Sequence, residues 1–240
     1  MKELLGMKLN NNTVHIWVVN ANGSSLPNFL SAAERKRWNG FFFSQDRQTF
    51  YQSHNALRLI LSHYLSEKPG EIEYELTSYG KPFLKNKSIQ FNLSHTDRMA
   101  VIAVTADAQI GIDIENLNRD VEYDDLAKRF FCESEYLKLV KTPPEEKRHA
   151  FFNCWTRKEA FIKAVGEGLS YPLNDFEVTL LSDEPVQINH IQDDLYTLKQ
   201  WMFDSKNIDE YTIATAVKRQ NSNFVYREFN FNELTEYTSP

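Results

Sequence analysis

The six residues from Ile110 to Glu115 constrain the fold of this chain more than any other stretch. Three isoleucines alternate there with Gly111, Asp113 and Glu115. An alternation of period two predicts a β-strand, because successive side chains of a strand point to opposite faces. One face of this strand would be apolar, and the other would carry two neighbouring carboxylates.

The two carboxylates, Asp113 and Glu115, allow two interpretations. Like charges this close repel one another unless a cation lies between them. The first interpretation is therefore a site for a hard divalent metal with oxygen ligands, and Mg²⁺ is the usual ion where phosphates are handled. The second is an edge strand with a solvated acidic face. The hexapeptide alone leaves both open.

The bulk properties exclude several classes of protein. The chain has 240 residues, which suits one large domain or two small ones. A net charge of −6 argues against a nucleic-acid footprint over the whole surface. No apolar run of about 18 residues exists, and residues 1–12 lack the apolar segment of a signal peptide. Two cysteines are too few for a disulfide framework. We therefore expect a cytoplasmic protein with buried thiols that binds neither membranes nor nucleic acids.

Periodic patterns predict an α/β (α+β) fold. The helical period of apolar residues predicts two long helices, at 46–65 and 145–165. Alternating residues predict two strand–turn–strand units, one from 99–104 and 110–115 and the other from 211–217 and 223–231. We expect two similar halves in a pseudo-two-fold arrangement, each a long helix packed on a small, mostly antiparallel sheet. The halves would be residues 1–106 and 107–240, and the second would carry the metal ligands.

The helix at 145–165 carries a second group of polar residues. Trp155, Glu159 and Lys163 are spaced by four, so they share one helix face. Glu159 and Lys163 also have the spacing of a surface salt bridge, which would contribute about 0.3–0.5 kcal/mol. On a helix this rich in aromatic residues, Glu159 would instead complete a metal site with Asp113 and Glu115. Lys163 would then face the anion that the metal holds.

Further cations favour a phosphate-containing substrate. Arg37 belongs to a basic run at 35–37, for which a solvated helix face is the alternative. Lys81 lies in a predicted turn, and Ser94 and His95 directly follow a predicted strand. No P-loop, GxSxG or HExxH motif occurs. Three carboxylates flanked by lysine and histidine favour phosphoryl-type transfer.

These residues resemble those of the 4′-phosphopantetheinyl transferases, in particular the larger, surfactin-synthetase-activating (Sfp-like) type. The similarity runs from about Arg35 to about residue 217. The Gly-x-Asp-x-Glu and Trp-x-x-Lys-Glu-Ala motifs, about forty residues apart, are specific for the family as a pair. The matching stretches are Tyr79-Gly80-Lys81-Pro82, Asn92-Leu93-Ser94-His95, Gly111-Ile112-Asp113-Ile114-Glu115, Arg129-Phe130-Phe131 and 155–163.

The resemblance implies a monomeric holo-[acyl-carrier-protein] synthase. Such an enzyme transfers the 4′-phosphopantetheine group of coenzyme A to a serine of an apo acyl or peptidyl carrier protein, and releases 3′,5′-ADP. The implied ligands of Mg²⁺, or of Mn²⁺ in its place, are Asp113, Glu115 and Glu159. The implied catalytic residues are Glu159, Lys163 and Asp113, and Glu159 would take the serine proton directly or through a metal-bound water. The implied ligands of the coenzyme's phosphates are Arg37, Lys81, Ser94, His95 and Lys163.

Two alternatives use the same residues. One is a metal-dependent phosphodiesterase or pyrophosphatase that acts on coenzyme A without a carrier protein, and the other is a non-catalytic module that binds coenzyme A. The chain also departs from the family pattern. Glu34 stands where some relatives carry a basic residue, and Thr49-Phe50 stands where some carry arginine and a small hydroxyl residue. In the loop at 116–125, Arg119 lies among four acidic residues, which predicts no strong electrostatic steering of an acidic carrier.

Overall fold

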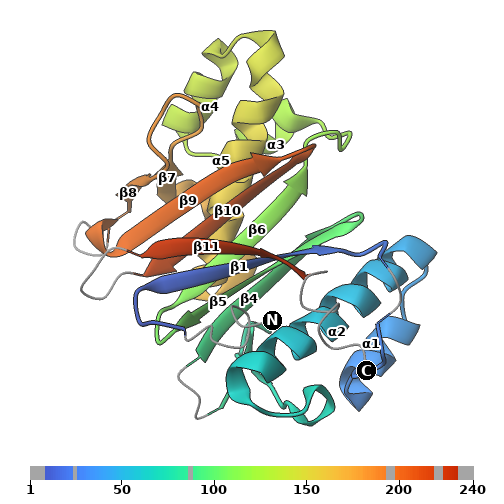
Figure 1. The fold of residues 1–240 in the computed structure, drawn as a ribbon. Helices are drawn as coiled ribbons and strands as arrows, with labels where there is room; N and C mark the ends of the chain where they lie inside the picture. The colour runs from blue at the N-terminus through green and yellow to red at the C-terminus, as the bar shows by residue number, and fades with distance from the viewer. Residues whose placement is uncertain (1–8, 24–25, 86–88, 193–197, 219–223, 232–240) are drawn as a thin grey trace. The chain divides into compact units, whose positions relative to one another are not determined.

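The computed structural model describes residues 9–23, 26–85, 89–192, 198–218 and 224–231 (Figure 1). These described residues form a mixed α/β fold with five α-helices and mostly antiparallel sheets, which confirms the predicted fold class. The chain divides into two compact units, one of residues 1–75, 82–107 and 225–240, and the other of 76–81 and 108–224. This division differs from a single cut at 106/107, because the last strand belongs to the first unit.

The first unit contains a four-stranded sheet in the order β11-β1-β5-β4. Neighbouring strands run antiparallel except β11, which pairs with β1 in parallel. Two short strands, β2 and β3, pair separately. The bounds are β1 Thr13–Asn20, β2 Glu75–Leu76, β3 Pro82–Phe83, β4 Ile89–Thr96, β5 Met99–Ala106 and β11 Val225–Asn230.

Two helices complete the first unit, α1 (Ala32–Asn39) and α2 (Ser44–Leu65). The predicted helix at 46–65 is therefore confirmed. The helix α1 begins at a capping box, in which the Ser31 hydroxyl accepts from the Glu34 amide and the Glu34 carboxylate accepts from the Ser31 amide. The helix α2 packs on β4 and β5, and its apolar stripe joins a core that includes Trp17 and Ile102.

The four strands of the two predicted strand–turn–strand units are present, but the two strands of each unit do not pair with one another. Both edges of β5 and of β10 (Tyr211–Lys218) are occupied, since β5 lies between β1 and β4, and β10 lies between β6 and β9. The strand β6 (Ile110–Asn116) therefore pairs with β10 instead of β5. The strand predicted at 223–231 is β11, although residue 223 lies outside the described range. Ser94 and His95, expected just after a strand, lie within β4 opposite Val101 and Ala100.

The second unit is built around the antiparallel sheet β6-β10-β9, with β9 at Trp201–Ile208, and a ribbon of β7 (Phe176–Val178) and β8 (Ile188–Ile191). One long helix, α5 (Pro144–Val165), lies along β6 and β10 (Figure 1), as the periodicity at 145–165 predicts. It ends at Gly166, whose φ of 90° is left-handed. Two shorter helices precede it, α3 (Tyr123–Phe130) and α4 (Glu133–Lys141).

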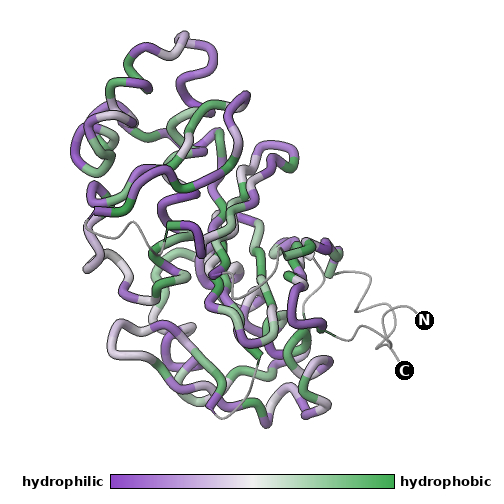
Figure 2. The backbone as a smooth tube through the Cα atoms, turned by 90° about the vertical axis from the view of Figure 1, so that its left-hand side faces the viewer, coloured by the Kyte–Doolittle hydropathy of each residue, from purple (hydrophilic) through white to green (hydrophobic). Residues whose placement is uncertain are grey.

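Short 3₁₀ turns link several of these elements, at Pro69–Glu71, Gly168–Ser170, Leu173–Asp175 and Leu198–Gln200. Hydrophobic and hydrophilic stretches alternate along the backbone (Figure 2), in keeping with helices and strands that each bury one face. In the part of the chain that the structure describes, we find no helical segment with the length and hydropathy of a bilayer span. Cys154 is buried, whereas Cys132 is only half-buried, and neither forms a disulfide.

Candidate active site

Four of the predicted site residues meet between β6 and α5. Asp113 on β6 is only 4% exposed, and the ammonium of Lys163 on α5 donates to its Oδ1 at 2.5 Å. Glu115 and Glu159 are half-buried and lie close enough to Asp113 for its charge to act on both of them. Residues about fifty positions apart in the sequence therefore form one cluster inside the second unit.

Burial and bonding argue against the two simpler interpretations, a solvated acidic strand face and a surface salt bridge within the helix. The strand β6 is indeed an edge strand of its three-stranded sheet. Its acidic face is not solvated, however, because α5 packs against it and Asp113 is buried. Lys163 does not act only as a surface partner within its own helix, since it is bound to Asp113 on β6. Trp155 lies on the same helix and stacks on Phe151 in the core.

Gly111 allows the two elements to come this close. A Cβ atom at Gly111 would lie 2.0 Å from the Ala160 carbonyl oxygen and 2.3 Å from the Ala164 nitrogen. Gly111 shares its strand face with Asp113, because the two are separated by one residue. Gly111 lies in the Gly-x-Asp-x-Glu motif, but this role of the glycine is not among those predicted above. The usable signal was a glycine inside a strand, which often marks a close backbone approach.

Electrostatics leave this cluster short of positive charge. Burial raises the pKa of Glu159 to about 7, and the charges of Asp113 and Glu115 add to that effect against the opposing charge of Lys163. Burial and the charge of Asp113 likewise raise the pKa of Glu115 to about 7, against the opposing Arg119 and Lys163. Both carboxylates would be stabilised in their ionised form by a further cation.

The donor set fits a divalent metal in its chemistry. Among the described residues, no three His, Cys, Asp or Glu side chains already stand in an arrangement that would hold an ion. The ammonium of Lys163 is on Asp113, and the guanidinium of Arg119 lies 3.2 Å from Glu115 Oε2. Three carboxylates offer only oxygen donors, which is the preference of Mg²⁺. Because positive charge is scarce around them, the three carboxylates suit such an ion once Lys163 and Arg119 have moved away from Asp113 and Glu115.

A buried ion pair fixes the helix next to Glu159. The preceding residue, Lys158, is fully buried and lies 2.8 Å from the Glu135 carboxylate of α4. Its ammonium also donates to the carbonyl oxygens of Leu173 and Phe176, at 2.7 and 2.5 Å. These bonds hold α5 in one rotation about its axis, with Glu159 and Lys163 toward β6. No local pattern in the sequence predicts a role for Lys158 or Glu135, because the two residues are 23 positions apart on different helices.

Lys81 belongs to the same unit and joins the same two elements. Its ammonium donates to the carbonyl oxygens of Ile110, at the start of β6, and of Ala164, near the end of α5, at 2.9 and 3.1 Å. Burial lowers the pKa of Lys81 to about 8. An ammonium has three N–H donors. Lys81 therefore acts first as a link between β6 and α5, and one donor is left for another partner.

The other predicted phosphate ligands lie in the first unit. The exposed Arg37 holds its guanidinium over the buried ring of Phe50, 5.3 Å from the centroid. The neighbouring Thr49 hydroxyl donates to the carbonyl oxygen of Asp97, two residues after His95. Residues 49 and 50 of α2 therefore contact both α1 and the β4–β5 turn. This explains the departure at Thr49-Phe50 in structural terms.

The departure at Glu34 also has a structural explanation. Besides its part in the capping box, the Glu34 carboxylate lies 2.7 Å from the guanidinium of the buried Arg58 and 3.1 Å from His54 Nδ1. Burial would raise the pKa of Glu34, but bonds from His54, the Ser31 amide and Arg58 outweigh it and lower that pKa to about 2. Glu34 thus ties α1 to α2 within the first unit.

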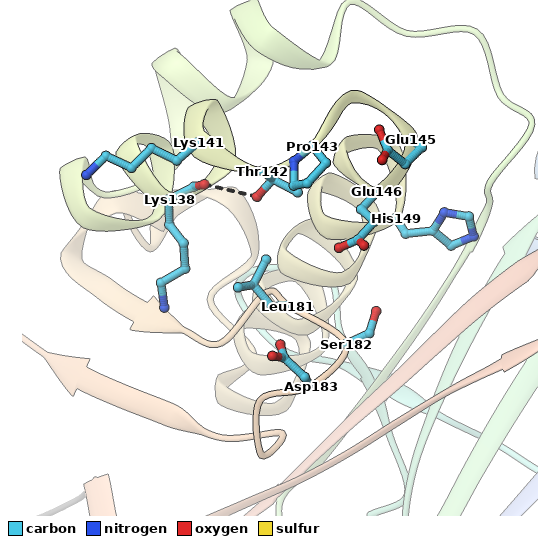
Figure 3. A pocket seen from close by; sticks show the side chains of 10 residues that line it. All are labelled: Lys138, Lys141, Thr142, Pro143, Glu145, Glu146, His149, Leu181, Ser182 and Asp183. Carbon is cyan, nitrogen blue, oxygen red and sulfur yellow. Dashed lines mark hydrogen bonds between the residues drawn. The ribbon is translucent and has the colours of Figure 1, made fainter.

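A hollow of about 730 Å³ lies between α4, the start of α5 and the loop at 181–183. Figure 3 shows the side chains that line it. Both signs of charge line it, from Lys141 and His149 to Glu146 and Asp183. Its lining includes no residue of the carboxylate cluster. The hollow is therefore separate from the candidate active site.

Two family descriptions match consecutive parts of this chain. Residues 109–216 match "4′-phosphopantetheinyl transferase superfamily", and residues 20–107 match "4′-phosphopantetheinyl transferase, N-terminal". A holo-(acyl-carrier-protein) synthase of Bacillus anthracis, solved in complex with CoA (3′,5′-ADP), is similar to 47% of this chain and 96% of that chain. Its TM-score is 0.38 and its identity 24%.

Curated relatives are similar over a greater length. The 4′-phosphopantetheinyl transferase HetI of Nostoc sp. is 38% identical over 184 residues, which are 73% of this chain and 77% of the relative. The 4′-phosphopantetheinyl transferase Sfp of Bacillus subtilis is 32% identical over 161 residues, 67% of this chain and 70% of the relative. The chain therefore belongs to the 4′-phosphopantetheinyl transferase superfamily, the enzymes that transfer the phosphopantetheine group of coenzyme A to carrier proteins.

Proposed function

We propose that the carboxylate cluster between β6 and α5 is the Mg²⁺-dependent active site of this transferase. The reaction moves 4′-phosphopantetheine from coenzyme A to a serine hydroxyl of an apo carrier protein and releases 3′,5′-ADP. The observation that carries the proposal is the meeting of three carboxylates and Lys163 on β6 and α5, in a chain of this superfamily. The pyrophosphate of coenzyme A is an anion that such a metal site can bind and neutralise.

Asp113, Glu115 and Glu159 would hold the Mg²⁺ ion. When bound, the ion neutralises the pyrophosphate of coenzyme A and polarises its P–O bonds. Glu159 accepts the proton of the serine hydroxyl as general base, directly or through a water. The serine oxygen then forms a bond to the phosphorus that bears the pantetheine arm, while the bond from this phosphorus to the bridging oxygen breaks. The electron pair leaves with 3′,5′-ADP.

Lys163 stabilises the negative charge that develops on the leaving phosphate. Its ammonium has to turn from Asp113 toward the substrate, and the Asp113 carboxylate would then be available to hold the metal. The remaining donor of Lys81 suits a phosphate oxygen near the start of β6. Arg37, Ser94 and His95 complete the proposed set of ligands for the phosphates of coenzyme A, including its 3′-phosphate.

The proposal extends to the carrier protein, the oligomeric state and the cellular compartment. The carrier is an apo acyl or peptidyl carrier protein, and the enzyme works as a monomer because one chain carries the whole residue set. A negative net charge argues against nucleic acid as a partner. Free thiols at Cys132 and Cys154 are in keeping with a reducing cytoplasm.

The test is to incubate the protein with coenzyme A, Mg²⁺ and each of several apo carriers, and to weigh the intact carriers. We expect a gain of about 340 Da on at least one carrier, the mass of the transferred group. Consumption of coenzyme A without any gain would favour the phosphodiesterase alternative. Binding of coenzyme A with neither consumption nor gain would favour the non-catalytic module.

A further inference from the structure

Arg119 is the second cation of the carboxylate cluster, and the proposed reaction gives it no part. We propose that Arg119 is a built-in counter-ion of Glu115 that competes with the divalent metal and so sets the metal affinity of the site. This inference rests on the proposed metal site. It makes Arg119 a positioning residue, because it touches a ligand carboxylate and not the reacting atoms.

The pairing of Arg119 with Glu115 joins an exposed cation to a half-buried acid. Arg119 Nη1 lies 3.2 Å from Glu115 Oε2. The side chain of Arg119 is 56% exposed, whereas that of Glu115 is 12% exposed. Since the guanidinium approaches from the solvent side, it can leave Glu115 without disturbing the packing of β6.

The backbone that carries Arg119 is fastened in place. The Leu117 amide donates to the Glu210 carbonyl oxygen at 2.7 Å, and the Arg119 amide donates to the Asn116 carbonyl oxygen at 3.1 Å. Arg148 of α5 donates through Nη1 to the carbonyl oxygens of Leu117 and Arg119, at 2.9 and 3.2 Å. The helix that carries Glu159 therefore also holds the backbone of the loop from which the Arg119 side chain reaches Glu115.

A metal ion that takes Glu115 as a ligand has to replace this guanidinium. For a partly exposed ion pair, the replacement should weaken metal binding by about twofold to fivefold. Lys163 competes in the same way at Asp113, but it belongs to the proposed catalytic set and cannot be changed without other effects. Arg119 is the cation of the cluster that can be varied to measure the competition alone.

The experiment is a titration of Mn²⁺ into the free protein, without coenzyme A or carrier, followed by the electron paramagnetic resonance signal of unbound Mn²⁺. We compare the parent with Arg119→Ala, Arg119→Lys and Arg129→Ala. Arg129 is an exposed arginine of α3 above the ring of Phe130, so its removal controls for the loss of one positive charge. Circular dichroism checks that every variant is folded.

We expect Arg119→Ala to bind Mn²⁺ about twofold to fivefold more tightly than the parent, and the other two variants to stay close to the parent. The gain should shrink as the salt concentration rises, because salt screens an exposed pair. A folded Arg119→Ala protein that binds Mn²⁺ as the parent does, or more weakly, would overturn the inference and leave the metal site standing. An absence of Mn²⁺ binding in all four proteins would overturn both.

Discussion

The backbone of Gly111 lies so close to that of Ala160 that a methyl group on Gly111 would be 2.0 Å from the Ala160 carbonyl oxygen. Gly111→Ala should therefore push β6 away from α5 and separate Asp113 from Glu159 and Lys163. We expect a loss of about 1–3 kcal/mol in the free energy of unfolding, which is typical of overpacking. Carrier modification should fall by more than the unfolded fraction explains.

Urea denaturation and the initial rate of carrier modification measure the two effects. Gly70→Ala is the matched control, because a Cβ atom there would meet nothing within 4 Å. Equal stability and rate in the two alanine variants would show that the contact between β6 and α5 does not set the site.

The sequence predicts the local elements of the site well, because their signals are local. Alternating isoleucines place β6, and a helical stripe places α5 almost to the residue. The proposed ligand set rests on side-chain chemistry and spacing together with the family motifs. The structure brings Asp113, Glu115, Glu159 and Lys163 together as that spacing suggests.

Strand pairing could not be predicted in this way, because it depends on which edges are still free. The sequence separation between β6 and β10 is about a hundred residues, and no short-range pattern in either strand names the partner. The parallel pairing of β11 with β1 joins strands that are even farther apart in the sequence, so it cannot be predicted from short-range patterns either. The buried ion pair of Lys158 and Glu135 could not be predicted from local patterns either, because the packing of α5 and α4 decides that these two side chains are buried together.

Acid should destabilise the first unit through Glu34. The pKa of Glu34 is lowered from 4.5 to about 2 in the folded protein, so the unfolded chain binds more protons between these two values. The contribution of Glu34 to the free energy of unfolding is fully present above pH 4.5 and is lost as the pH falls toward 2. At about 1.4 kcal/mol for each pKa unit, the loss should reach about 3 kcal/mol.

The variant Glu34→Gln tests this pH dependence. We expect it to be less stable than the parent at pH 7 and to show a flatter change of stability between pH 4.5 and 2, as measured by urea denaturation. Glu71→Gln is the control, since Glu71 is exposed and pairs with the exposed Lys68. A Glu34→Gln protein with the full pH dependence of the parent would contradict the assignment.

Lys158 should be costly to remove alone and less costly to remove together with its partner. Lys158→Met leaves the buried Glu135 carboxylate without its counter-ion, which should cost about 3–5 kcal/mol. Adding Glu135→Gln removes the stranded charge and keeps a hydrogen-bond acceptor, so part of this stability should return. A double-mutant cycle in urea measures the coupling, and purely additive losses would argue against a functional ion pair.

Asp113→Ala should remove metal dependence and activity together. Asp113 is the buried member of the cluster, and its charge acts on both other carboxylates. We expect no Mg²⁺-stimulated carrier modification above background in this variant. The parent should lose its own activity in the presence of a chelator and regain it when Mg²⁺ is added back. Parent activity that survives the chelator would contradict the metal assignment.

The rate at which Glu159→Gln modifies an apo carrier tests the proposed site most directly. Glutamine keeps the size of the side chain but can neither accept the serine proton nor supply a negatively charged ligand. Glu146→Gln, an exposed glutamate of the same helix, is the control. With intact-mass detection at saturating coenzyme A and Mg²⁺, we predict a loss of about a hundredfold or more for Glu159→Gln and a parent-like rate for Glu146→Gln. A parent-like rate in Glu159→Gln would contradict the assignment of this cluster as the active site.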